Sequence, residues 1–295
     1  MDRKGIKKKF LNITVWKRGG ERAPHKPLLL LYALGRLLRD KNRVIPYEDI
    51  EKNVVDLLKD FGPSRASYHA EYPFWRLQQD GIWEVENAEK IEITASGDVK
   101  KKELLEYHVS GGFSEEIFYA LQKDEHLFTE IVQELLDANF PSSIHEDILQ
   151  SVGLDLVAPE TYKRRDPEFR EKILRAYEYR CAVCGFDVRV GHSPVALEAA
   201  HIKWKQAGGP DKETNGIALC SLHHKLFDRG AFTLSEQMQI MVSDRANGHC
   251  GFDEWLMRFH GKILTAPQKI IYVPDQAFMK WHVKEVFQGE YRELK

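Results

Sequence analysis

The sequence predicts an α+β protein of two domains: a mostly helical N-terminal domain with a small β-hairpin, and a C-terminal domain stapled by zinc. The 295 residues are 43% hydrophobic and 30% charged, which indicates folded domains and excludes a disordered chain. Helical apolar patterns fill the first half, whereas short apolar runs and paired cysteines fill the second. Pro159 and the Lys163-Arg164-Arg165 run favour a boundary that gives domains 1–157 and 158–295.

The N-terminal domain is predicted to begin with two long helices. Pro27 stands just ahead of the apolar run 28–38, as prolines do at helix starts, so this run should be a central helix. Apolar residues at helical spacing predict a second helix over 46–59, which Gly62-Pro63 ends.

A small hairpin and a group of acidic helices should complete this domain. Residues 82–85 and 90–93 are predicted to pair through the turn Glu86-Asn87-Ala88. Three or four helices that carry most of the acidic residues should follow to about residue 151, with Ser114 capping the first.

The C-terminal domain should alternate short strands, Gly-rich loops and helices. Asp166-Pro167-Glu168 is typical of a helix start, and we expect that helix to run to about residue 179. Further helices are predicted over 221–228, 252–260 and 276–287.

Charge is distributed unevenly along a chain whose formal net charge is only −2. Residues 1–26 hold nine Lys and Arg against two acids, and residues 161–230 hold thirteen against nine. Residues 103–160 hold thirteen acids and one Lys. Basic regions of this kind are typical of nucleic-acid binding, although a lysine-rich tail can also be merely solvated. We expect the acidic middle to face away from any polyanion.

The sequence predicts a cytoplasmic protein with no membrane contact. The longest apolar run, residues 28–34, has seven residues, whereas a membrane span needs about 20. Asn12 and Lys17 interrupt what would be the apolar core of a signal peptide. The chain has four cysteines, and a reducing compartment argues against disulfides and for metal binding.

Two short metal-ligand pairs predict a structural zinc site. Cys181 and Cys184 form a C-x2-C pair, and Cys220 and His223 form a C-x2-H pair. Zinc takes four nitrogen or sulfur ligands in a tetrahedron, and each pair can supply one edge of it. A variant with His249 or Cys250 in place of His223 is less favoured, because these residues lie far from Cys220 in the sequence.

The segment between these pairs resembles the HNH nuclease motif. Leu197-Glu198-Ala199-Ala200-His201-Ile202 is followed by Asn215 and by His224, which gives a His at a strand end, an Asn in a loop and a His on a helix. The resemblance covers about residues 180–234 and implies a zinc-stapled ββα-metal fold. It implies that His201 is the general base, that Asn215 holds the loop and orients His201, and that His224 binds a catalytic metal such as Mg or Mn.

Chemistry and helix geometry agree with these roles. A neutral His can take a proton from water near pH 7, and a divalent metal stabilises charge on the phosphate that is cut. His223 and His224 are neighbours on a predicted helix, so their side chains lie about 100° apart around it. Cys220 and His223 share one face. This favours His223 for zinc and His224 for catalysis.

The second protein ligand of the catalytic metal stays open. Many HNH nucleases have an Asp immediately before the first His, and here that position is Ala200. Asp228 lies one helical turn after His224 and could bind the metal, or it could form a hydrogen bond at the helix end. Glu198 is the other candidate, although strand alternation can point it elsewhere.

Two N-terminal segments resemble the sulfur-binding domain of phosphorothioate-dependent restriction endonucleases. They are Ala23-Pro24-His25-Lys26-Pro27-Leu28-Leu29-Leu30-Leu31-Tyr32-Ala33-Leu34 and Tyr68-His69-Ala70-Glu71-Tyr72-Pro73-Phe74-Trp75-Arg76-Leu77. Those enzymes pair this domain with a C-terminal HNH domain, which is the order here. The resemblance covers about residues 5–95 and implies binding to double-stranded DNA in which sulfur replaces a non-bridging phosphate oxygen.

This resemblance also implies contact residues. His25 and Lys26 would lie at the modified backbone, and Tyr72 with Pro73 would wall the sulfur pocket. We expect Tyr72-Pro73 to be an extended, exposed turn, because the residue before a proline avoids the helical region. Phe74 and Trp75 are expected in the core. Further candidate DNA contacts are Arg18, His69 and Arg76.

Together the two resemblances predict a type IV, modification-dependent restriction endonuclease. It would bind phosphorothioated DNA and hydrolyse nearby phosphodiester bonds. One alternative is an HNH nuclease that is guided by another DNA modification. The other is a zinc-stabilised DNA-binding protein without cleavage, which would need neither His201 nor His224. Cleavage of both strands by one HNH site predicts a homodimer or two successive nicks.

Overall fold

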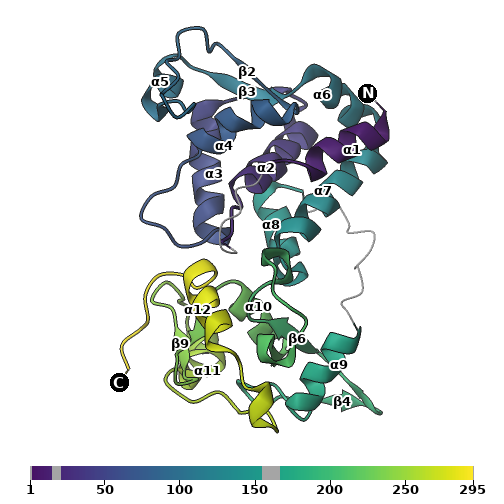
Figure 1. The fold of residues 1–295 in the computed structure, drawn as a ribbon, viewed down its shortest axis with the longest axis vertical. Coiled ribbons are helices and arrows are strands. Elements are labelled where there is room, and N and C mark those ends of the chain that lie inside the picture. The colour runs from purple at the N-terminus through teal and green to yellow at the C-terminus, as the bar shows by residue number, and fades with distance from the viewer. Residues whose placement is uncertain (1, 15–20, 155–166, 295) are drawn as a thin grey trace. The chain divides into compact units, whose positions relative to one another are not determined.

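The computed structural model describes residues 2–14, 21–154 and 167–294. The chain forms two compact units, Met1–Thr161 and Tyr162–Lys295 (Figure 1). The boundary predicted from residues 157–166 lies outside the described residues. No helix among the described residues is long and apolar enough to cross a membrane.

The N-terminal unit is built around the buried helix α2 (His25–Asp40). It packs against α3 (Tyr47–Phe61), α7 (Glu125–Asn139) and α8 (His145–Val152). Helix α2 begins before the predicted start, so Pro27 lies in its first turn, where a missing N–H costs no helical hydrogen bond. A Cβ on Gly35 would lie 1.9 Å from the carbonyl oxygen of Val152, so α2 and α8 cross closely only with glycine there.

The predicted hairpin is wrong, and a three-stranded antiparallel sheet takes its place. Strand β3 (Ser110–Phe113) lies between β1 (Val44–Pro46) and β2 (Trp83–Glu86). Residues 90–93 form no strand, and β2 pairs with β3, where Trp83 lies opposite Phe113. Ser-Gly-Gly-Phe has low strand propensity, so its pairing comes from tertiary packing.

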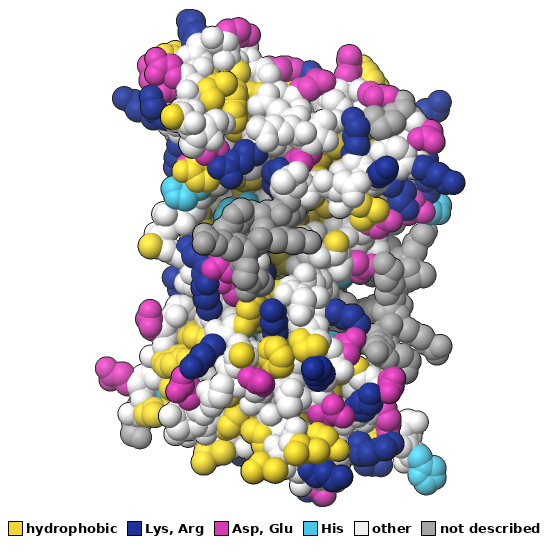
Figure 2. Space-filling model, in the orientation of Figure 1, with side chains coloured by type: hydrophobic (Ala, Val, Ile, Leu, Met, Phe, Trp, Pro, Cys, Tyr) yellow, Lys and Arg dark blue, Asp and Glu magenta, His cyan; other side chains and the backbone are white. Residues whose placement is uncertain are grey.

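Helix α1 (Arg3–Leu11) joins the basic N-terminus to the acidic middle of the chain. Ile6 and Phe10 are buried, and the helix packs on α7. Glu130 of α7 lies 3.0 Å from Arg3 and 3.1 Å from Lys7. Part of the basic N-terminus is therefore neutralised within the unit. On the face that Figure 2 shows, basic and acidic side chains are interspersed and do not form one patch of a single sign.

The acidic helices follow as predicted. Ser114 is the N-cap residue of α6, although its side chain makes no capping hydrogen bond. Helices α7 and α8 come next, and their apolar faces are buried. The other short helices of this unit are α4 (Glu71–Arg76), α5 (Lys101–Glu106) and α6 (Glu115–Lys123).

The C-terminal unit centres on two strands and a helix. Strands β6 (Leu197–His201) and β7 (Gly216–Cys220) are antiparallel, with Leu197 opposite Cys220 and His201 opposite Gly216. Helix α10 (Ser221–Asp228) follows β7 directly and packs on both strands. Helix α9 (Pro167–Ala176) also packs on both strands. This is a ββα arrangement inside a largely apolar core.

The remaining predicted helices of this unit are present but shorter. Helix α9 ends at Ala176, and the residue expected to cap it, Asp166, lies outside the described residues. The helix predicted over 252–260 ends at Trp255, and the next turn is a 3-10 helix over Met257–Phe259. The remaining strands and α-helices are β4 (Arg189–Val190), β5 (Ser193–Pro194), β8 (Phe232–Leu234), β9 (Ile240–Val242), α11 (Cys250–Trp255) and α12 (Gln276–Glu285).

Candidate functional site

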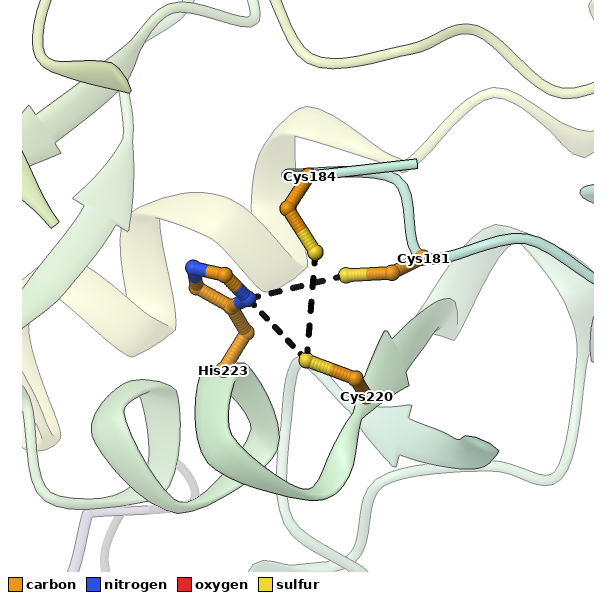
Figure 3. Close-up of side chains that lie close together, drawn as sticks. All are labelled: Cys181, Cys184, Cys220 and His223. Carbon is orange, nitrogen blue, oxygen red and sulfur yellow. Dashed lines mark hydrogen bonds between the residues drawn. The ribbon is translucent and has the colours of Figure 1, made fainter. Parts of the chain in front are cut away.

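Cys181, Cys184, Cys220 and His223 form one cluster that could hold a metal ion, as Figure 3 shows. Their ligand atoms all lie within 4.8 Å of one another. Nδ1 of His223 is 3.1 Å from Sγ of Cys220 and 3.7 Å from Sγ of Cys181. A tetrahedral zinc with bonds of about 2.0–2.3 Å requires ligand atoms roughly 3.3–3.8 Å apart. The donor set suits zinc, and these two distances, with 4.0 Å between Sγ of Cys184 and Sγ of Cys220, lie close to this range.

Backbone geometry places these ligands. Gly185 has a φ of 77° and donates its N–H to the carbonyl of Cys181, which closes the first turn. Ala182 donates to Ala218, which ties this turn to β7. Nε2 of His223 lies 2.9 Å from the carbonyl oxygen of Trp255 and must donate to it, so the lone pair of Nδ1 faces the sulfur atoms.

The alternative zinc ligands have no place in this cluster. Cys250 is exposed at the start of α11. Neither it nor His249 belongs to the metal-binding group found among the described residues. The geometry therefore selects His223, as the helix-face argument predicted.

His201 lies at the end of β6, as predicted, and two contacts fix its ring. It stacks on Phe169 of α9 with ring centroids 4.0 Å apart and planes 15° apart. Its Nε2 is 2.8 Å from Oδ1 of Asp211. Burial lowers the pKa of His201, and Asp211 partly opposes this effect. The imidazole is therefore neutral near pH 7, which is the form that a general base needs.

Asn215 is fully buried and holds the loop that follows His201. Its Oδ1 accepts a hydrogen bond from the N–H of Lys203, and its Nδ2 donates to the carbonyls of Lys203 and Pro210. Its own carbonyl accepts from the N–H of Ile202. These contacts support the predicted loop-holding role. Asn215 does not bond the His201 ring itself, but it holds the backbone of Ile202, the next residue.

His224 lies between two carboxylates, one at each ring nitrogen. Nδ1 is 2.7 Å from Oε2 of Glu198, and Nε2 is 3.0 Å from Oδ2 of Asp228. Trp204 donates its Nε1–H to the other oxygen of Asp228, and Ser221 donates its hydroxyl to the other oxygen of Glu198. Strand alternation does not point Glu198 away from this site, because its carboxylate contacts His224 and Ser221 of α10.

The two carboxylates differ in their access to solvent. The side chain of Asp228 is 1% exposed, whereas that of Glu198 is 30% exposed. Of the two, only Glu198 is open to solvent.

In the N-terminal unit, the residues predicted to contact DNA differ in burial and in charge. Arg18 lies outside the described residues. Lys26 is buried, and its Nζ is 2.5 Å from Asp80, which also accepts from the N–H of Thr14. Burial, then Arg65 and His69, lowers the pKa of His25 to about 4. His25 is therefore uncharged near pH 7, and the charge of Lys26 is already paired.

Tyr72 and Pro73 lie in helix α4, so the expected extended turn is wrong. Pro73 falls in the first turn of α4, where a proline is tolerated because its N–H would have no helical partner. Tyr72 is 37% exposed, whereas Pro73 and Phe74 are buried. Phe74 thus confirms the core expectation, and Trp75 is only half-buried.

A small group of polar side chains surrounds Tyr72. The ring of His69 stacks on it with centroids 5.0 Å apart. The guanidinium of Arg76 lies 5.1 Å from its centroid and forms two hydrogen bonds of 2.7 Å with Asp98. Asp98, Asp80 and Asp211 belong to no recognisable sequence motif. Only the structure identifies them as the partners of Arg76, Lys26 and His201.

Comparison with known families defines the class of this protein. Residues 3–157 match the family model "ScoMcrA-like, DNA sulfur-binding domain", and residues 181–235 match the model "HNH endonuclease". The chain thus combines a DNA sulfur-binding domain with an HNH endonuclease domain. Because the first match spans more than half of the chain, the protein belongs to the ScoMcrA-like DNA sulfur-binding family.

Solved structures give weaker likenesses. The sulfur-binding domain of ScoMcrA, complexed with phosphorothioated DNA, is 23% identical over 51% of this chain and 96% of its own, with a TM-score of 0.45. The corresponding domain of SprMcrA is 21% identical over 54% and 98%, also with a TM-score of 0.45. The type IV restriction endonuclease ScoMcrA is 22% identical over 51% of this chain and 32% of its own, with a TM-score of 0.44. No curated protein matches the chain.

Proposed function

We propose that this protein is a modification-dependent restriction endonuclease that binds phosphorothioated double-stranded DNA and hydrolyses nearby phosphodiester bonds. Residues 1–157 would recognise the DNA, and residues 158–295 would cut it. The observation that carries the proposal is a sulfur-binding domain in the same chain as a ββα unit with His201, Asn215 and His224 at the expected positions.

Recognition of sulfur follows from its weak hydration. Sulfur is larger and more polarizable than the phosphate oxygen that it replaces, so it enters an apolar pocket at little cost. Pro73 has no N–H to offer an oxygen. Tyr72 presents the exposed part of the proposed wall, and the guanidinium of Arg76 beside it is held by two hydrogen bonds to Asp98. An oxygen that loses its water there without a new donor costs about 1–3 kcal/mol.

Hydrolysis is assigned to His201. Its neutral ring accepts the proton of a water molecule that attacks the phosphorus. Asn215 keeps the following loop closed, so that the ring stays against Phe169.

His224 is the protein ligand that would hold a divalent metal such as Mg or Mn. Such a metal, when bound, stabilises negative charge on the phosphate and on the leaving oxygen. Asp228, named from the sequence as the second ligand, is buried and already accepts the Trp204 N–H. We favour Glu198 as the ligand, because it is exposed to solvent, and Asp228 as the residue that orients the His224 ring.

The cluster of Cys181, Cys184, Cys220 and His223 would hold a structural zinc. All four positions are occupied by protein ligands, which is typical of closed structural sites and not of catalytic ones. The zinc would connect the turn after α9 to the start of α10.

Separation of binding from cleavage tests the proposal. His201→Ala removes the proposed base without touching the N-terminal unit, so it should bind modified DNA like the wild type and cut at least about 100-fold more slowly. Cutting should also stop when a chelator removes the divalent metal. Near wild-type cutting by His201→Ala would overturn the nuclease assignment. Absence of cutting by the wild type on modified DNA would favour a binding protein.

A further inference from the structure

Asp211 and Lys205 lie next to the proposed base and have no assigned role. Oδ1 of Asp211 is 2.8 Å from Nε2 of His201, and its Oδ2 is 2.5 Å from Nζ of Lys205. Both Asp211 and Lys205 belong to the loop that Asn215 holds closed. We propose that Asp211, oriented by Lys205, is a positioning residue that fixes the tautomer of His201; this rests on the proposed role of His201 as the base.

The hydrogen-bond chemistry sets the direction of the effect. An ionised carboxylate only accepts hydrogen bonds, so Nε2 of His201 must carry the proton. In the neutral ring, Nδ1 is then the nitrogen with the lone pair. Among the described residues, no hydrogen bond to this Nδ1 is found, so it is the atom that can accept a proton from water.

Two features distinguish the contact between His201 and Asp211 from an ordinary surface ion pair. The side chains of His201 and Asp211 are 21% and 27% exposed, so their contact is shielded from water on most sides. The pKa of Asp211 is lowered, because Lys205 and His201 outweigh the opposing effect of burial, so the carboxylate is ionised at neutral pH. With Phe169 on the ring face and Asp211 at Nε2, the ring has one orientation and one tautomer.

Lys205 has a specific part in this arrangement. Its ammonium group only donates hydrogen bonds, so the side-chain atom of residue 211 that faces Lys205 must be an oxygen. In Asp211→Asn, Lys205 would therefore hold the amide oxygen and turn the NH2 group toward His201. That amide would donate to Nε2 and force the proton onto Nδ1, which is the wrong tautomer.

This leads to a rescue experiment. Asp211→Asn should reduce kcat on modified DNA by about 100- to 10,000-fold. Lys205→Met alone should lower kcat much less than Asp211→Asn does, because the Asp211 carboxylate presents an accepting oxygen to Nε2 in either orientation. The double variant Asp211→Asn/Lys205→Met frees the amide to flip, so we expect it to recover at least about 10-fold over Asp211→Asn. The control is the double variant Asp211→Asn/Lys212→Met, which removes one positive charge at an exposed neighbouring lysine. Its kcat should be no higher than that of Asp211→Asn.

The pH profile adds a second measurement. Apart from Asp211, the charged groups that affect the pKa of His201 are Asp228, which raises it, and Lys205, which lowers it. Asp211 also raises this pKa, so its replacement by Asn should shift the acidic limb of kcat/KM to lower pH. A merely structural role would lower the rate without moving this limb.

The tautomer itself can be measured without activity. Nitrogen NMR of the wild-type protein at neutral pH should show His201 protonated at Nε2, with the signal assigned by its loss in His201→Gln. Protonation at Nδ1, or equal rates for the two Asp211→Asn proteins with and without Lys205, would overturn the inference. Wild-type cutting by His201→Ala would instead overturn the proposed function, so the two failures are distinguishable.

Discussion

At the scale of single residues, the two histidines of the ββα motif differ in their partners. His201 has a carboxylate at one ring nitrogen, whereas His224 has carboxylates at both. The first arrangement suits a base that must keep one nitrogen ready for a proton. The second suits a metal ligand, because one carboxylate can join the metal while the other holds the ring.

The second ligand of the catalytic metal can be identified by substitution. Glu198→Gln should weaken Mn²⁺ binding to zinc-loaded protein by at least about 10-fold, whereas Asp228→Asn should mainly lower the melting temperature. Titration calorimetry measures the affinity, and Glu254→Gln, an exposed carboxylate of the same unit, serves as the control. The reverse order of effects would restore Asp228 as the ligand.

Lys26 provides a second prediction at this scale. Its ion pair with Asp80 is nearly buried, with side chains 11% and 3% exposed. Lys26→Met leaves the Asp80 carboxylate unpaired and should lower the free energy of unfolding by about 3 kcal/mol. In contrast, Lys59→Met breaks an exposed, solvent-screened pair with Asp56 and should leave the free energy of unfolding nearly unchanged. Urea denaturation compares the two.

The opposite result would change the role of Lys26. If both variants were equally stable, and Lys26→Met reduced the salt dependence of DNA binding, the lysine would be a phosphate contact after all.

At the scale of elements, features that depend on short sequence spacings could be predicted, whereas pairings between distant segments could not. The cysteine and histidine cluster and the position of His224 on α10 follow from local spacing, because C-x2-C turns and helix faces are local geometry. Strand β3 was missed because its two glycines show no alternation and are needed for packing: a Cβ on Gly111 would lie 2.6 Å from the Phe74 ring. Asp211 was missed because a loop, not a motif, carries it to His201.

The proposed zinc site at Cys181, Cys184, Cys220 and His223 should hold the elements of the C-terminal unit together. Cys184→Ala leaves three ligands and should release zinc and unfold this unit, while the N-terminal unit keeps its structure. Zinc content and hydrogen exchange measure both effects, with the exposed Cys250→Ala as the control. Retention of one zinc and of normal cutting by Cys184→Ala would show that the ligand assignment is wrong.

At the scale of the whole molecule, charge and sulfur contribute differently to DNA binding. Basic side chains attract any DNA backbone and depend strongly on salt. The proposed pocket at Tyr72 responds only to the atom at one phosphate. A duplex with one phosphorothioate and an all-phosphate duplex of the same sequence share the contribution of charge. Comparing their affinities at one salt concentration therefore isolates the contribution of sulfur.

Recognition of sulfur by the N-terminal unit is therefore tested most directly by the affinity ratio for these two duplexes, measured at fixed salt for the wild type and for Tyr72→Ala. The desolvation difference of about 1–3 kcal/mol predicts a wild-type preference for sulfur of roughly 5- to 150-fold. Tyr72→Ala should reduce this ratio while its affinity for the all-phosphate duplex changes little. Equal wild-type affinity for both duplexes would show that the protein does not recognise sulfur.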